Sequence, residues 1–184
     1  MYYYGAAAPD SGRARLEDIR RGQFEGLREE VGSNPARRPD VGEAKLHPTA
    51  GATAVGARQL LIAYNINLAT PDVEVARRVA RKVRASSGGL PFVKAMGVEV
   101  RGRAQVSMNL TDFEQTPVHV AFEAVEREAR NEGVAIEGSE IVGLVPAKAV
   151  ALSADFFRRM EGFHPGLVLE SRLAEARGAP QTSP

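Results

Sequence analysis

The nine residues LLIAYNINL at positions 60–68 constrain the fold more than any other stretch of this chain. Every second residue is apolar: Leu60, Ile62, Tyr64, Ile66 and Leu68. Asn65 and Asn67 lie between them. Because side chains alternate between the two faces of a strand, this spacing predicts a β-strand with one apolar and one more polar face.

The residues that follow predict a helix, two strands, a second helix, one or two short strands and a third helix. The first helix has Thr70 as its expected N-cap and Pro71 at its first position. The strands FVKAMGVEV and AQVSMNLTD flank a tight-turn sequence, Arg101-Gly102-Arg103. The second helix is expected to have Thr116 as its cap and to end at Gly133. The segment VAIEGSEIVGLVP then leads to a third helix that begins at Pro146.

A βαββαβ order is typical of an α+β fold of the ferredoxin-like type. Right-handed crossovers place the first and third strands side by side in the centre of the sheet, with both helices on one face. The open face would then carry short uncharged side chains from these two strands: Asn65, Asn67, Gln105, Ser107, Asn109 and Thr111. Such a face suits water, a polar interface or a ligand cleft, and these alternatives stay open. It has no aromatic residue on which RNA bases could stack.

Residues 1–58 are irregular and rich in Gly, Pro, Arg and Asp, with one helical segment that reads as two short pieces. They form no complete core and resemble the tail end of another unit. Within HPTAGATAVGAR, Gly51 and Gly56 have the glycine spacing of a P-loop, but Ala57 and Arg58 replace its Lys and Ser/Thr. A nucleotide phosphate site is therefore disfavoured. Small residues at this density still indicate a close approach of backbone to something.

Composition excludes several classes of function. The 184 residues carry a net charge of +1, which favours neither nucleic acid nor membrane as a partner. There is no cysteine, which suits a cytoplasmic location. The three histidines are scattered, so no metal site is expected. No apolar run is long enough to cross a bilayer, and the first residues do not read as a signal peptide.

Four longer stretches carry a resemblance: HPTAGATAVGARQLLIAYNINL, SGGLPFVKAMGVEV, AQVSMNLTDFEQTPVHVAFEAVEREA and GSEIVGLVPAKA. Together they resemble the formiminotransferase domain of glutamate formimidoyltransferases, over essentially residues 2–160. The resemblance implies transfer of the formimino group from N-formimino-L-glutamate to N5 of tetrahydrofolate, a step of histidine degradation and folate one-carbon metabolism. It implies two similar α/β subdomains with a substrate tunnel between them, tetrahydrofolate as a substrate, and no metal.

By this resemblance, residues 1–58 are the C-terminal remnant of the N-terminal subdomain with its linking loop. Residues 59–162 are the C-terminal subdomain, and residues 163–184 are a tail expected to be partly disordered. The folate-binding segment would comprise Gly42, Glu43, Ala44, Lys45, Leu46, His47, Pro48, Thr49, Ala50 and Gly51. Residues expected to line the cleft are Arg58, Asn65, Asn67, Gln105, Ser107 and Asn109.

The family's catalytic histidine lies in an H-P-R-x-G segment upstream of the matched part, and His47-Pro48 aligns instead with the linking loop. His119, near the start of a helix and beside its apolar stripe, is favoured as a structural or exposed helix residue. Glu140 and Lys148 are either polar groups at the cleft or a surface residue and a helix-face residue. We therefore expect an incomplete or split transferase that is inactive as an isolated chain. The alternative is a non-catalytic module that binds folate or forms a subunit interface. The open face is expected to bind a second copy or a separately encoded N-terminal subdomain.

Overall fold

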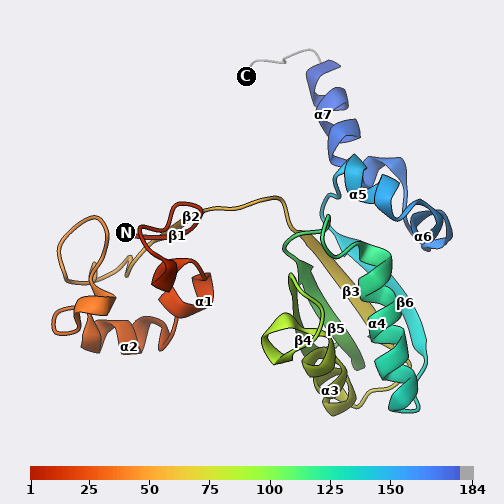
Figure 1. Cartoon of the computed structure of the whole chain (residues 1–184), viewed down its shortest axis with the longest axis horizontal. Coiled ribbons are helices and arrows are strands. Elements are labelled where there is room, and N and C mark those ends of the chain that lie inside the picture. The colour runs from red at the N-terminus through yellow and green to blue at the C-terminus, as the bar shows by residue number, and fades with distance from the viewer. Residues whose placement is uncertain (179–184) are drawn as a thin grey trace. The chain divides into compact units, whose positions relative to one another are not determined.

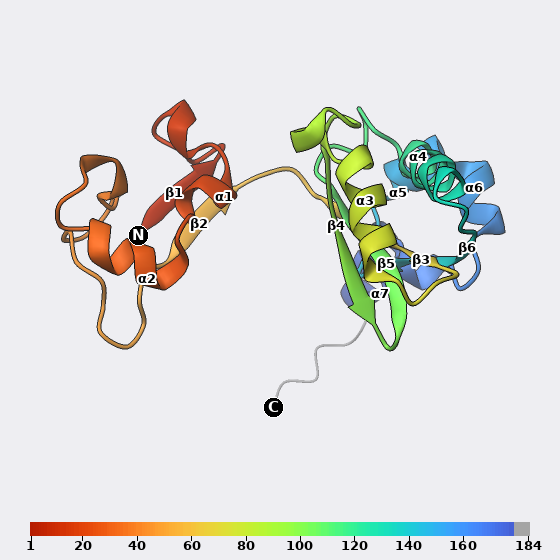
Figure 2. The ribbon, with the colours of Figure 1, turned by 90° about the horizontal axis from the view of Figure 1, so that it is seen from below.

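The computed structural model describes residues 1–178, and the predicted tail at 179–184 lies outside them. The chain divides into two compact units, Met1–Gln59 and a second one that begins at Leu60. Figures 1 and 2 show that the two units differ in architecture, since one has a two-stranded ribbon with short helices and the other a four-stranded sheet covered by helices.

The second unit is built on an antiparallel sheet with the strand order β4-β5-β3-β6. Its elements are β3 (Ile62–Leu68), α3 (Val73–Val83), β4 (Val93–Val100), β5 (Arg103–Leu110), α4 (Val118–Asn131) and β6 (Ile136–Val142). The predicted α+β fold is confirmed. The expected neighbours β3 and β5 are paired at the centre of the sheet, as in a split βαβ motif.

The core of this unit lies between one face of the sheet and the helices α3 and α4, which Figures 1 and 2 show on the same side. The four apolar side chains of β3 are completely buried: Ile62, Tyr64, Ile66 and Leu68. Their partners on β5 are also buried: Ala104, Val106, Met108 and Leu110. The alternating pattern therefore predicted the buried face correctly. Leu60 was wrongly included, since the strand begins at Ile62 and Leu60 is 56% exposed.

Both predicted threonine caps are wrong, because neighbouring groups take their places. Asp72 caps α3, since its carboxylate accepts the Glu74 N–H at 2.9 Å, and the Thr70 hydroxyl only supports Asp72 by accepting its N–H. Thr116 is buried and donates instead to the Pro91 carbonyl at 2.6 Å. Pro117 takes the N-cap position of α4.

The two predicted glycine positions are confirmed. Arg101 and Gly102 join β4 to β5 with φ angles of 53° and 78°, the left-handed values that a two-residue hairpin turn needs. Gly133 follows α4 with φ 73° and ends it.

The end of the second unit differs from the sequence prediction. The expected third helix is two helices, α5 (Ala147–Leu152) and α6 (Ala154–Arg159), which meet at the buried Ser153. Beyond α6 the chain continues into α7 (Leu169–Gly178). The chain is held here by backbone hydrogen bonds of Val145 with Leu167 and Leu169 and by the packing of Phe163 on Phe157.

The first unit has a much smaller core. Its strands β1 (Tyr2–Gly5) and β2 (Ala54–Ala57) pair in parallel. The predicted two-piece helix is confirmed as α1 (Leu16–Ile19) and α2 (Gln23–Glu30). Only three apolar residues are buried: Tyr2, Leu27 and Val31. A two-stranded sheet over so few buried side chains is marginal by itself.

Gly97 of β4 allows α3 to lie directly against the sheet. Replacing Gly97 should therefore destabilise the packing of α3 on the sheet. A Cβ at this position would lie 2.2 Å from the Arg77 nitrogen and 2.5 Å from the Ala76 carbonyl carbon. Because both atoms belong to a helix backbone, we expect Gly97→Ala to lower the free energy of unfolding by about 2 kcal/mol. Urea unfolding followed by circular dichroism measures this.

The matched control for this substitution is Gly138→Ala in β6, where an added Cβ meets no atom within 4 Å. It should change the unfolding free energy much less than Gly97→Ala. Equal losses in the two variants would show that close packing of α3 on Gly97 is not the cause.

Candidate functional site

The segment expected to contact folate, residues 42–51, ends in a tight closed turn. His47 and Gly51 exchange two backbone hydrogen bonds of 3.0 Å each, and Gly51 has φ 66°. The His47 ring closes the turn from within, because its Nδ1 accepts the N–H groups of Thr49 at 3.3 Å and Ala50 at 3.0 Å. His47 is therefore a structural acceptor in this turn, with only Nε2 left over for other partners.

A partly buried ion pair anchors the chain just before this segment. Asp40 accepts hydrogen bonds from the Tyr3 amide at 2.7 Å and from Arg13 Nη1 at 2.6 Å. Burial disfavours the charged carboxylate, but these two donors outweigh it and hold the pKa of Asp40 below its ordinary value. Arg13 also donates to the Arg38 carbonyl at 2.6 Å. The start of the segment is thereby fixed to β1.

Two hollows of the first unit share part of this segment. One, of about 480 Å³, lies against Met1 and Tyr2, and the other, of about 650 Å³, lies against Phe24 and Arg28. The residues common to both are Lys45, Leu46, His47 and Pro48. Lys45 is well exposed and forms an ion pair with Glu43. The segment thus contributes backbone, one imidazole and one ammonium group to the lining of both hollows.

The small residues after the turn pack within the first unit itself. Residues 54–57 form β2 and are not a loop. Gly56 lies opposite Tyr4 in the register, and a Cβ there would lie 2.2 Å from the Tyr4 ring. The close approach at Gly56 is therefore made by an aromatic ring of the same unit. Arg58, which follows β2, donates to the Gln59 carbonyl at 2.9 Å.

In the second unit, the predicted polar residues share the sheet face opposite the helices. The register places Asn65 beside Ser107, Asn67 beside Gln105, and Asn109 beside Ala63. Gln105 is only 5% exposed and donates from Nε2 to Asn67 Oδ1 at 2.9 Å. These amides are therefore fixed in place by one another and by the sheet.

Glu140 of β6 completes this polar cluster, which comprises Asn65, Asn67, Gln105 and Glu140. Its register partner is Asn65. Glu140 Oε1 accepts a hydrogen bond from Asn65 Nδ2 at 3.2 Å and a longer one from Gln105 Nε2 at 3.5 Å. The sequence marked Glu140 only as a possible polar group, because its place beside the amides depends on how three strands are aligned.

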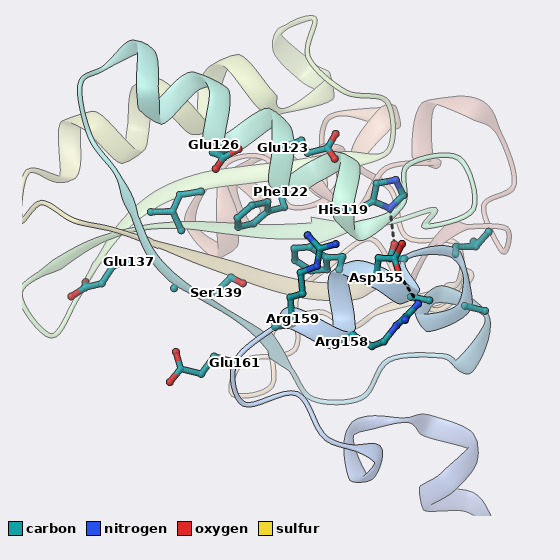
Figure 3. A pocket seen from close by; sticks show the side chains of 18 residues that line it. His119, Phe122, Glu123, Glu126, Glu137, Ser139, Asp155, Arg158, Arg159 and Glu161 are labelled. Atoms are coloured by element: carbon teal, nitrogen blue, oxygen red, sulfur yellow. Dashed lines mark hydrogen bonds and ion pairs between the residues drawn. The ribbon is translucent and has the colours of Figure 1, made fainter.

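Sequence reasoning missed a cavity of about 860 Å³ formed by α4, β6 and α6 (Figure 3). Phe122 and Glu123 line it from α4, and Arg158 and Arg159 from α6. His119 Nδ1 lies 2.9 Å from the Ser153 hydroxyl, which ties α4 to the junction of α5 and α6. The only signal was His119 itself, which the sequence favoured as a structural residue of the helix.

Within residues 1–178, no group of three or more metal-ligating side chains is placed to hold a metal ion. No helix in that range is long and apolar enough to span a membrane.

The fold defines an α+β protein whose second unit has a split βαβ topology and an open polar sheet face. Residues 63–171 match the family model described as the formiminotransferase domain, and residues 1–58 match the one described as its N-terminal subdomain. The chain belongs to the formiminotransferase domain family.

Several named proteins are similar to the chain. It is 42% identical over 176 residues to a glutamate formimidoyltransferase of Streptococcus pyogenes serotype M1, covering 94% of this chain. It is 39% identical over 180 residues to one from Thermoplasma acidophilum, covering 96% of this chain. A formimidoyltransferase-cyclodeaminase of Mus musculus is 41% identical over 165 residues, which cover 85% of this chain and 30% of that protein. The chain spans 58% and 59% of the lengths of the first two relatives.

Proposed function

We propose that the chain forms part of a glutamate formimidoyltransferase, which moves the formimino group of N-formimino-L-glutamate to N5 of tetrahydrofolate. The observation that carries the proposal is the match of residues 63–171 to the formiminotransferase domain, together with 42% identity to a protein of that name. The reaction belongs to histidine degradation and folate one-carbon metabolism. The lack of cysteine suits a reducing cytoplasm as its location.

In the proposed reaction, the N5 lone pair forms a bond to the amidine carbon and creates a tetrahedral centre. N5 then loses a proton and the glutamate nitrogen gains one. The bond between carbon and that nitrogen breaks, which leaves 5-formimino-tetrahydrofolate and L-glutamate. General acid–base catalysis of such proton movements contributes roughly 10²–10⁴-fold.

We infer that the proton carrier belongs to a part of the protein outside these 184 residues. Two of the histidines already have structural partners on Nδ1, since His47 closes its turn and His119 contacts Ser153. In this proposal residues 1–58 belong to the N-terminal subdomain and its link, and residues 59–162 form the C-terminal subdomain. The open sheet face is then covered by the N-terminal subdomain or by a second copy.

We also propose that residues 42–51 contact the folate, which the two hollows beside Lys45 and His47 support. Gly51→Ala tests this, because φ 66° is strained for alanine and the closed turn should be less populated. We expect tetrahydrofolate to bind about tenfold more weakly, measured by calorimetry under anaerobic conditions.

Gly88→Ala is the control for that experiment. Gly88 has φ 85°, so alanine is similarly strained there, and an added Cβ meets no atom within 4 Å. This position lies in the second unit, outside the proposed folate segment. Folate affinity should stay unchanged in this variant. Equal weakening in both variants would mean that the turn at Gly51 has no particular part in binding.

The transfer reaction itself needs a reconstitution experiment. The 184-residue chain would be assayed alone and together with the portion of the S. pyogenes relative that the match does not cover. We expect no 5-formimino-tetrahydrofolate from the chain alone and measurable product from the mixture. Turnover by the chain alone would contradict the inferred source of the proton carrier.

The alternative function is a folate-binding or interface module without activity. Folate binding by the chain, with no product from the reconstituted mixture, would favour that alternative. That result would also contradict the proposal that the chain takes part in formimino transfer.

A further inference from the structure

The polar cluster on the open face contains one carboxylate, Glu140, and its neighbours form hydrogen bonds to only one of its two oxygens. Glu140 Oε1 accepts the hydrogen bonds from Asn65 and Gln105 that define the cluster. No hydrogen bond is formed to Glu140 Oε2 within residues 1–178, and the Glu140 side chain is exposed. Oε1 is therefore positioned by amides, whereas Oε2 has no hydrogen-bond partner among the described residues.

Glu140 also lacks a cation among the described residues, unlike the acidic residue nearest to it on the same strand. Glu137 pairs with Arg103 at 3.0 Å, whereas the partners of Glu140 are neutral amides. Because the sheet holds the two amides, the orientation of the carboxylate is set before anything binds. An exposed and oriented carboxylate without a counter-ion is suited to a cationic ligand with several donors.

The donor in the proposed function has such a group. An amidine is a strong base, and its protonated form is a planar cation with N–H donors on two nitrogens of one carbon. This is the same fork geometry by which a guanidinium binds a carboxylate with two parallel hydrogen bonds. The acceptor in that pair has to be a carboxylate, because a neutral amide offers one acceptor and one donor.

We propose that Glu140, positioned by Asn65 and Gln105, binds the protonated formimino group of N-formimino-L-glutamate and thereby selects this donor over its formyl analogue. The analogue has a carbonyl oxygen in place of the =NH₂⁺ group, so it would turn an acceptor toward Glu140. This inference rests on the proposed function, since it takes the donor from it. Another group could place two parallel donors on this carboxylate: the 2-amino group and N3–H of a pterin ring. Unlike the amidinium, that pair of donors carries no charge.

The test measures the affinity of the 184-residue chain for N-formimino-L-glutamate and for N-formyl-L-glutamate, by NMR titration of the side-chain amides. We expect the formimino compound to bind roughly 10- to 100-fold more tightly, as for a hydrogen bond to a charged group. Glu140→Gln should abolish this preference, because glutamine can still accept from Asn65 but cannot accept both donors of the fork. Glu123→Gln, with the same charge change on α4, should keep the preference.

Several results would overturn the proposal. These are no measurable binding of the formimino compound, equal affinities for the two compounds, or a preference that survives Glu140→Gln. Loss of the preference in Glu123→Gln would instead assign amidinium binding to the cavity beside α4. Weaker tetrahydrofolate binding in Glu140→Gln, with donor affinity unchanged, would assign the carboxylate to the pterin.

The reconstituted mixture separates this inference from the proposed function. If the mixture transfers the formimino group and Glu140→Gln leaves the donor KM unchanged, the inference fails and the function stands. If no variant of the mixture transfers the group, the function fails. The binding preference of the isolated chain is then still a separate measurement of whether Glu140 recognises an amidinium.

Discussion

The pairing of β3 with β5 is the contact on which the second unit depends. It aligns two alternating sequences so that their large apolar side chains meet α3 and α4, and their amides and hydroxyls meet on the other face. A shift of one residue in either strand would exchange the two faces completely. The same register therefore builds the core and places Asn65 and Gln105 within reach of Glu140, so stability and the proposed chemistry of the open face have one origin.

The first unit is held together in a different way. Its buried apolar residues are few, and arginine side chains supply many of the long-range contacts. Arg37 donates to the carbonyls of Asp18 and Ile19 at the end of α1. Arg13 donates to the Asp40 carboxylate and to the Arg38 carbonyl two residues before it. Hydrogen bonds of this kind fix geometry, but they replace bonds to water and stabilise much less than a buried core. We therefore attribute little independent stability to this unit.

The sequence predicted the second unit well because its strands and helices have strong periodic patterns. Thr70 was mistaken for a cap because Asp72, two residues later, is an equally good acceptor for the first helical N–H groups. The break at Ser153 has neither proline nor glycine to mark it, so the cavity beside His119 was not predictable. Gly56 was explained only when Tyr4, far away in the sequence, was found across it. The polar face was predicted strand by strand, but the part played by Glu140 needed the alignment of β6 with β3.

The second unit carries its own core, whereas the first is held mainly by polar contacts. Amide hydrogen exchange on the 184-residue chain tests it most directly, since both units are observed in one sample. We predict that the paired amides of β3 and β5 exchange at least about 100-fold more slowly than those of β1 and β2, because they open only when the larger core unfolds. Equal protection of the two sheets would contradict the account, since the small first unit would then be as stable as the second.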